Sequence, residues 1–85
     1  MNVKVYSISE CAYCDMLKDL LESKGVEYEE YDLLENEGIA REIVGKTGQF
    51  CVPVLEIDGQ LIVGFDRERV EMIISDKILG GIRLE

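Results

Sequence analysis

The 85-residue sequence predicts an α/β fold, in which three helices pack on a four-stranded mixed sheet in the order β-α-β-α-β-β-α. Three observations predict it. An alternating apolar segment, Val3–Ser7, runs directly into a helical pattern, and a second strand pattern follows that helix. Two strands joined by one short helical crossover run parallel. Further on, Asp58-Gly59 separates two short apolar runs, which predicts a tight antiparallel hairpin.

The first helix and its neighbouring strands make up the amino-terminal half. Val3–Ser7 is rich in β-branched and aromatic residues, as strands are. We expect a helix from Cys11 to Lys24, ended by Gly25, and a second strand over Val26–Leu33. The helix residues expected to face the core are Cys14, Leu17 and Leu21, flanked by Met16 and Leu20. We interpret Met16 as a core residue in preference to one that faces a substrate.

Acidic residues alternate with apolar ones along the second strand. The simplest interpretation is the solvated face of an edge strand, where charge also discourages pairing with other chains. The alternative is an acidic recognition patch. A second helix is expected over Glu35–Lys46, interrupted by Gly45 and Gly48. Its inward residues should be Ile39, Ile43 and Val44.

The carboxyl-terminal half is expected to form the hairpin and a last helix. After a loop at Thr47–Phe50, strands are predicted over Val54–Ile57 and Leu61–Val63. Asp66 is a suitable N-cap for a helix that ends at Gly80-Gly81. That helix should bury Val70, Ile73, Ile74 and Ile78. The complete order is the architecture of a minimal thioredoxin fold, which we expect to form one domain over residues 1–85.

The chemistry centres on Cys11-Ala12-Tyr13-Cys14, at the junction of the first strand and the first helix. A C-x-x-C in this position indicates a dithiol–disulfide redox centre, because this spacing lets both sulfurs lie on one helical turn and form a bond. The first sulfur then faces unpaired N–H groups at the start of the helix, which favour an anion. The thiolate is the nucleophile in disulfide exchange. We therefore expect Cys11 to attack and Cys14, one turn on, to resolve.

Composition excludes several other kinds of site. The sequence contains no histidine, which rules out Ser-His-Asp and Cys-His catalytic arrangements, and three cysteines cannot complete a usual Cys/His zinc site. The net charge of −9 opposes binding to nucleic acid and to anionic membranes. It leaves open a basic protein partner, or it only maintains solubility. With no apolar run long enough to cross a bilayer and no secretory signal, we expect a cytoplasmic protein.

Pro53, the only proline, precedes a strand that should lie inside the sheet. A proline inside a sheet removes a ladder hydrogen bond and needs a particular reason. A cis peptide bond between Val52 and Pro53 would provide one, because it would turn the chain and leave the Val52 N–H and C=O free. Those groups would then hold an extended substrate segment beside Cys11.

Together these motifs resemble the glutaredoxin family. The matching features, over about residues 3 to 76, are C-x-Y-C, Lys18, Leu20-Leu21, Gly25, Val52-Pro53, the Asp58-Gly59 turn and Gly64-Phe65-Asp66. The resemblance implies that Cys11 attacks, that Cys14 resolves and that Pro53 is cis. It also implies glutathione as a co-substrate, with no tightly bound cofactor and no metal. The implied glutathione-binding residues are Tyr13, Gln49, Val52, Pro53, Gly64, Phe65 and Asp66.

The sequence departs from the family pattern near the motif. Ala12 replaces a common proline, and Ile8 stands where a lysine often holds a glutathione carboxylate. Glu10 adds a negative charge that would raise the pKa of the neighbouring thiol and repel the tripeptide. We therefore expect a glutathione site that is present but electrostatically weakened. Lys18, the nearest cation in sequence, is either an offset to Glu10 or, more simply, a solvated lysine.

Cys51 replaces the threonine of the family's Thr-Val-Pro. We expect this small, soft side chain to pack under the active site. The alternative is a secondary redox role, as an additional disulfide or a glutathione adduct under oxidation.

The leading hypothesis is a monomeric thiol–disulfide oxidoreductase acting on protein disulfides or glutathione mixed disulfides. Its reductant would be glutathione or, because Gly64-Phe65-Asp66 is closer to the glutaredoxin-like redoxins, thioredoxin reductase. A second hypothesis is a glutaredoxin that holds a [2Fe–2S] cluster between two chains with two glutathiones, since Ala12 removes the rigid proline that disfavours the cluster. A colourless protein after anaerobic reconstitution with iron and sulfide would refute it. A redox-inert interaction module is the third hypothesis, and it predicts no reductase activity.

Overall fold

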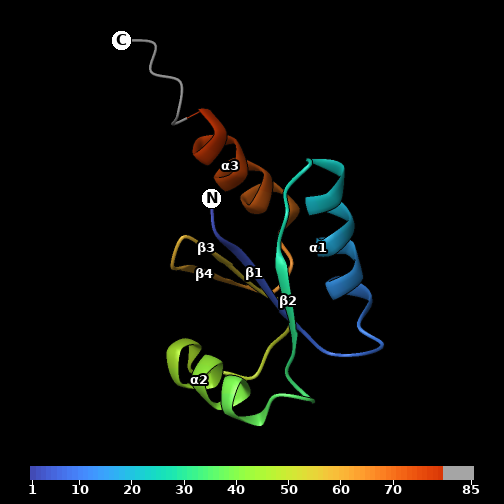
Figure 1. Ribbon diagram of the computed structural model, residues 1–85, viewed down its shortest axis with the longest axis vertical. Helices are drawn as coiled ribbons and strands as arrows, with labels where there is room; N and C mark the ends of the chain where they lie inside the picture. The colour runs from blue at the N-terminus through green and yellow to red at the C-terminus, as the bar shows by residue number, and fades with distance from the viewer. Residues whose placement is uncertain (80–85) are drawn as a thin grey trace.

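The computed structural model describes residues 1–79, and its elements follow the predicted order (Figure 1). They are β1 (Val3–Ser7), α1 (Ala12–Ser23), β2 (Glu29–Asp32), α2 (Glu37–Thr47), β3 (Val54–Ile57), β4 (Gln60–Val63) and α3 (Arg67–Leu79). The strands form one sheet in the order β2-β1-β3-β4. β1 pairs parallel with β2 and antiparallel with β3, and β3 pairs antiparallel with β4. The predicted mixed sheet with three helices is confirmed, and β2 is an edge strand as expected.

The helices cover both faces of the sheet, with α1 and α3 on one face and α2 on the other (Figure 1). Successive strand residues point to opposite faces, so β1 contributes to both cores. Val3 and Val5 pack with α1 and α3, whereas Tyr6 packs under α2. The larger core also contains Leu17, Leu20, Leu21, Val26, Leu55, Ile57, Ile62, Val70 and Ile74. None of the helices within residues 1–79 has the length and apolar character needed to cross a membrane.

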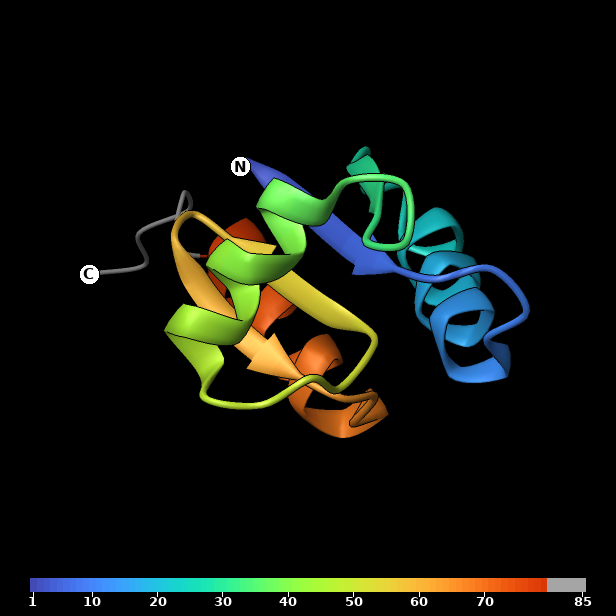
Figure 2. The same ribbon diagram turned by 90° about the horizontal axis from the view of Figure 1, so that it is seen from below.

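The register of the sheet gathers three loops at one end of it. Tyr6, one residue before the end of β1, pairs with Val54 at the start of β3, and Val54 pairs with Val63 at the end of β4. The loops 8–11, 48–53 and 64–66 therefore leave the sheet at the same end, which Figure 2 shows from below. At the opposite end, Asp58 and Gly59 form the predicted hairpin turn with φ of 48° and 89°.

β2 is shorter than the predicted strand over Val26–Leu33. Its pairing with β1 covers only Glu29–Asp32, opposite Lys4–Ser7. The preceding segment instead closes the end of α1, where the Val26 N–H donates to the Leu21 C=O at 2.9 Å. Val26 is still buried, so the hydrophobic pattern identified a core residue but not a strand residue.

α2 begins and ends about one to two residues later than predicted. It begins at Glu37 because Asp32 holds the preceding turn, with its Oδ1 accepting the Leu34 N–H at 2.8 Å. Gly45 lies inside the helix and does not interrupt it. Gly48 does end it, with a φ of 76° and its N–H donating to the Val44 C=O at 2.8 Å.

Two predicted core residues lie at the surface. Met16 is 48% exposed and Ile78 is 49% exposed, so their assignment to the core was wrong. Helical spacing places both near the apolar stripes of α1 and α3, but neither belongs to the buried core clusters. Ile73 is half-buried against the larger core. The predicted helix end at Gly80-Gly81 lies outside the described residues.

Candidate active site

Cys11 and Cys14 lie at the first turn of α1 and form a disulfide, with their Cα atoms 5.2 Å apart. Cys11 is the N-cap residue of the helix, with extended backbone angles of −116° and 107°. Its Sγ accepts a hydrogen bond from the Cys14 N–H at 3.1 Å, and its C=O accepts the Asp15 N–H at 3.1 Å. A sulfur in this position meets the unpaired donors of the helix start, which favour its anionic form when the disulfide is reduced.

The two sulfurs differ in access to solvent. Cys11 is partly exposed, whereas Cys14 has 0% of its surface exposed and packs into the molecule. A substrate sulfur can therefore reach Cys11 but not Cys14 without displacing other side chains.

The segment before β3 forms the second part of the site. The Val52–Pro53 peptide bond is cis, as the family resemblance implied. The buried Pro53 accepts a hydrogen bond at its C=O from the Gly64 N–H at 2.8 Å, which ties this segment to the loop after β4. Within residues 1–79, neither the N–H nor the C=O of Val52 takes part in a hydrogen bond. They are available to an extended ligand.

The other residues assigned to a glutathione site differ in exposure. Tyr13, within the redox motif, is 62% exposed, and Gln49 is also exposed. Phe65 is half-buried against the larger core. Asp66 caps α3 as predicted, because its Oδ1 accepts the Arg69 N–H at 3.2 Å. The register of the sheet brings the segments that carry these residues to the end where Cys11 lies.

Comparison with known proteins agrees with this arrangement. A family model described as Glutaredoxin matches residues 3–62. The chain is 38% identical to glutaredoxin 3 of Escherichia coli K12 over 65 residues. This match covers 76% of this chain and 78% of that protein. This chain belongs to the glutaredoxin family.

Two further likenesses extend over most of this glutaredoxin-family protein. It is 31% identical over 73 residues to an uncharacterized glutaredoxin-like 8.6 kDa protein in the rubredoxin operon of Clostridium pasteurianum, covering 86% of this chain and 97% of that protein. The crystal structure of a glutaredoxin from Archaeoglobus fulgidus superposes with a TM-score of 0.77 at 22% identity, over 86% of this chain and 85% of that one. That structure shares the thioredoxin-like fold.

In this glutaredoxin-family protein, Cys51 is exposed, so the prediction that it packs under the active site was wrong. Its neighbour Val52 packs toward the core under α2, whereas Cys51 lies at the surface. The secondary redox role of Cys51 stays a prediction.

Lys18 is not simply solvated, because it forms ion pairs with two carboxylates. Its Nζ lies 2.9 Å from Glu30 Oε2 on β2 and 3.5 Å from Asp15 Oδ1. The hydrogen bond from Lys18 holds the pKa of Glu30 below its ordinary value, and Glu30 in turn raises the pKa of Lys18. Ser7 Oγ also donates to Glu30 Oε2 at 2.9 Å. Lys18 therefore joins α1 to β2, and Glu10 stays exposed.

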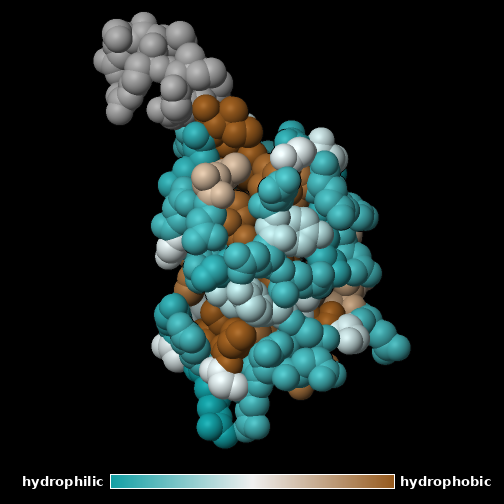
Figure 3. All heavy atoms as spheres, in the orientation of Figure 1, coloured by the Kyte–Doolittle hydropathy of each residue, from teal (hydrophilic) through white to brown (hydrophobic). Residues whose placement is uncertain are grey.

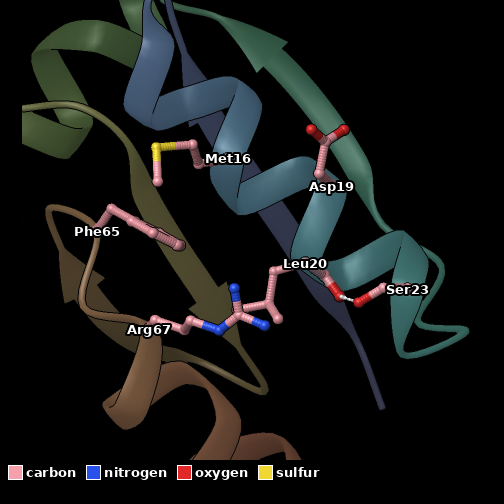
Figure 4. A pocket seen from close by; sticks show the side chains of 6 residues that line it. All are labelled: Met16, Asp19, Leu20, Ser23, Phe65 and Arg67. Carbon is pink, nitrogen blue, oxygen red and sulfur yellow. Dashed lines mark hydrogen bonds between the residues drawn. The ribbon is translucent and has the colours of Figure 1, made fainter.

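A groove of about 310 Å³ between α1 and the start of α3 was missed by the sequence analysis (Figure 4). It is lined by Met16, Asp19, Leu20, Ser23, Phe65 and Arg67. One pattern in the sequence indicates this groove. Tyr13, Met16 and Leu20 follow one another at i, i+3 and i+7, so they lie on one side of α1. This stripe begins inside the redox motif and continues into the groove.

Proposed function

We propose that this protein is a thiol–disulfide oxidoreductase that reduces protein disulfides or glutathione mixed disulfides through Cys11 and Cys14. Membership of the glutaredoxin family indicates the reaction class. The observation that carries the proposal is the position of Cys11 Sγ at the N-cap of α1, 3.1 Å from the Cys14 N. The disulfide form described above is the oxidised product of the cycle.

In the first step, the Cys11 thiolate attacks one sulfur of the substrate disulfide. A Cys11–substrate bond forms, the substrate S–S bond breaks, and the other sulfur leaves as a thiolate that takes a proton from solvent. The free N–H and C=O of Val52 support an extended substrate beside the reacting sulfurs. The N–H donors at the start of α1 stabilise Cys11 while it is anionic.

In the second step, the Cys14 thiol loses its proton and attacks Cys11 Sγ. The Cys11–Cys14 bond forms and the substrate's second sulfur leaves as a thiolate that is protonated. The protein has then supplied two electrons and the proton of Cys14, and the other proton has come from solvent in the first step. Burial of Cys14 directs it to this intramolecular attack, because no substrate reaches it from solvent. On glutathione mixed disulfides, a second glutathione can replace Cys14 in this step.

For the return of the dithiol, we propose glutathione as a co-substrate at a weakened site formed by Tyr13, Gln49, Val52, Pro53, Gly64, Phe65 and Asp66. The weakening follows from charge. Ile8, where relatives often carry a lysine, packs against the core under α2, and Lys18 is held by Glu30 and Asp15. With Glu10 exposed and a net charge of −9, the protein repels an anionic tripeptide. Because this negative charge weakens glutathione binding, thioredoxin reductase with NADPH is the competing reductant. Either reductant acts in a reducing compartment such as the cytoplasm.

The test measures turnover of three purified variants and the wild-type protein. Cys11→Ser should reduce neither a protein disulfide nor a glutathione mixed disulfide, because it removes the attacking sulfur. Cys14→Ser should retain activity on the glutathione mixed disulfide and lose activity on the protein disulfide. Cys51→Ser is the matched control, since it removes the remaining thiol. Activity that survives in Cys11→Ser would show that the assignment of the nucleophile is wrong.

The same proteins identify the reductant. Oxidised wild-type protein is supplied either with glutathione or with thioredoxin reductase and NADPH, and the return of the Cys11–Cys14 dithiol is followed by alkylation and mass spectrometry. Reduction by glutathione supports the proposed co-substrate. Reduction by the reductase alone would contradict glutathione dependence while leaving the disulfide chemistry in place.

A further inference from the structure

The groove beside the redox motif has an apolar mouth. Met16 of α1 and Phe65 of the loop before α3 point toward each other across it, and Leu20 lies deeper (Figure 4). Met16 leaves 48% of its surface exposed there, although a methionine in this part of α1 fits the core pattern. Asp19 and Ser23 line the α1 side, and the Asp19 carboxylate is directed away from the opening between Met16 and Phe65 (Figure 4). The mouth is therefore open and apolar.

Arg67 provides a charged end to the groove. Its guanidinium reaches toward Leu20 from the start of α3 (Figure 4). Its Nε donates to Glu71 Oε1 at 2.8 Å, while Glu71 Oε2 accepts from Lys24 at 3.2 Å. Within residues 1–79, the terminal Nη groups of Arg67 make no hydrogen bond. The single carboxylate of Glu71 is thus shared by Arg67 and Lys24. The Nη donors of Arg67 and part of its positive charge are left to bind a second carboxylate.

The groove continues directly from the redox pair. An α-helix rises about 1.5 Å per residue, so Met16 lies about 7.5 Å and Leu20 about 13.5 Å beyond Cys11 along the axis of α1. An extended peptide advances about 3.3 Å per residue. A peptide whose cysteine reacts at Cys11 therefore places a side chain about two or three residues away over the apolar mouth. A side chain about four or five residues away reaches the guanidinium of Arg67.

We propose that this groove binds an extended segment of a disulfide-bearing protein substrate. The segment carries an apolar side chain about two or three residues from its reacting cysteine and a carboxylate about two residues further on. The apolar side chain packs between Met16 and Phe65, and the carboxylate binds the Nη groups of Arg67. Docking adds no chemical step, because Cys11 attacks the bound cysteine as in the proposed function, on which this inference rests.

The test uses synthetic peptides that contain one cysteine as a mixed disulfide with 2-nitro-5-thiobenzoate. Attack of reduced Cys11 on the peptide sulfur releases the coloured thiol, which is the better leaving group. The reference peptide carries leucine and glutamate at the two positions given above. In one comparison peptide asparagine replaces leucine, and in the other lysine replaces glutamate. Both chain directions are synthesised, and the mixed disulfide of cysteine alone serves as the small substrate.

For the wild-type protein, we expect the reference peptide in one chain direction to react about fivefold faster than the asparagine peptide, since part of an apolar side chain leaves water. It should react about threefold faster than the lysine peptide, because lysine replaces the ion pair between the peptide glutamate and Arg67 with a repulsion between two cations. Equal rates for all peptides, with the small substrate still reduced, would overturn the inference and leave the proposed function in place. A protein that reduces neither peptides nor the small substrate would instead contradict the proposed function.

Three variants in the groove and two matched controls test the residues. Met16→Glu should remove the preference for leucine, and Arg67→Glu should invert the preference between glutamate and lysine. Met72→Glu and Arg69→Glu make the same changes at positions on α3 outside the groove and should keep both preferences. Arg67→Gln gives a neutral second variant, in which the charge preference is lost without inversion. Circular dichroism spectra confirm that each variant is folded.

Two outcomes would assign the groove to a different occupant. If Met16→Glu changes the rate of reduction by glutathione while the peptide preferences persist, the groove belongs to the tripeptide site and the inference is wrong. If the wild-type protein sediments as a dimer that Met16→Glu converts to a monomer, a second copy of the chain occupies the groove, and the inference is likewise wrong.

Discussion

At the scale of single residues, Tyr6 is a buried phenol held by the sheet. Its hydroxyl donates to Glu56 Oε1 at 3.2 Å, and its ring stacks on Tyr31 with centroids 5.6 Å apart. Burial, followed by the negative charge of Glu56, raises the pKa of Tyr6 to about 12. The folded protein therefore retains this proton at a pH where the unfolded chain, with a value near 10.0, has lost it.

This shift predicts a loss of stability at high pH. Tyr6 contributes its full stabilisation below pH 10, and the contribution, at most about 3 kcal/mol, is lost as the pH rises from about 10 to about 12. Tyr6→Phe cannot titrate, so its unfolding free energy should fall less steeply over this range. The measurement is urea unfolding at pH 8, pH 10 and pH 11, with Tyr13→Phe, a change at an exposed tyrosine, as the control. Parallel pH profiles for Tyr6→Phe and the wild-type protein would contradict the assignment.

At the scale of secondary structure, α2 contains two glycines with opposite roles. Gly45 lies in the helix interior, where an added Cβ meets no atom within 4 Å. Gly48 ends the helix with a φ of 76°, a conformation that side chains with a Cβ rarely adopt. The same substitution at the two positions should therefore change stability in opposite directions.

Gly45→Ala should stabilise the protein by about 0.5–1 kcal/mol, because alanine loses less backbone entropy in a helix. Gly48→Ala should destabilise it by about 1 kcal/mol, since alanine is strained in the left-handed region. Urea unfolding at pH 7 measures both, and each variant is the control for the other. Two changes of the same sign would show that α2 does not end at Gly48 in solution.

At the scale of the whole molecule, charge is unbalanced. The chain has 18 acidic and 9 basic residues, and the face in Figure 3 is mostly hydrophilic, with apolar atoms gathered over α2 and α3. Several basic side chains form ion pairs, such as Lys46 with Glu42 at 3.1 Å. Because acidic residues outnumber basic ones by 18 to 9, the basic side chains are too few to pair with every carboxylate. Repulsion among the unpaired carboxylates therefore opposes folding.

Salt should stabilise this protein. Between about 20 mM and about 500 mM NaCl, we expect the unfolding free energy at pH 7 to rise by about 1 kcal/mol, because screening weakens the repulsion more than it weakens exposed ion pairs. Glu35→Lys, in the exposed turn before α2, changes the net charge from −9 to −7 and should reduce the dependence on salt. A decrease in stability with added salt would mean that the ion pairs outweigh the repulsion.

The sequence by itself determined the features that depend on neighbouring residues. Strand and helix periodicity predicted every element, Asp58-Gly59 predicted the hairpin, and Asp66 predicted the cap of α3. The spacing of Cys11 and Cys14 placed both sulfurs at the start of one helix. These features follow from backbone geometry within a few residues, which a sequence states directly.

Only the tertiary structure decided which surfaces are covered. Met16 fits the helical pattern of a core residue but lies exposed at the groove, and Cys51 is exposed while its neighbour Val52 packs against the core. The pairing of Lys18 with Glu30 joins segments whose sequence does not reveal their contact. The groove between α1 and α3 arises in the same way. Burial and pairing depend on how distant segments pack and on strand register, and no local pattern in the chain encodes either.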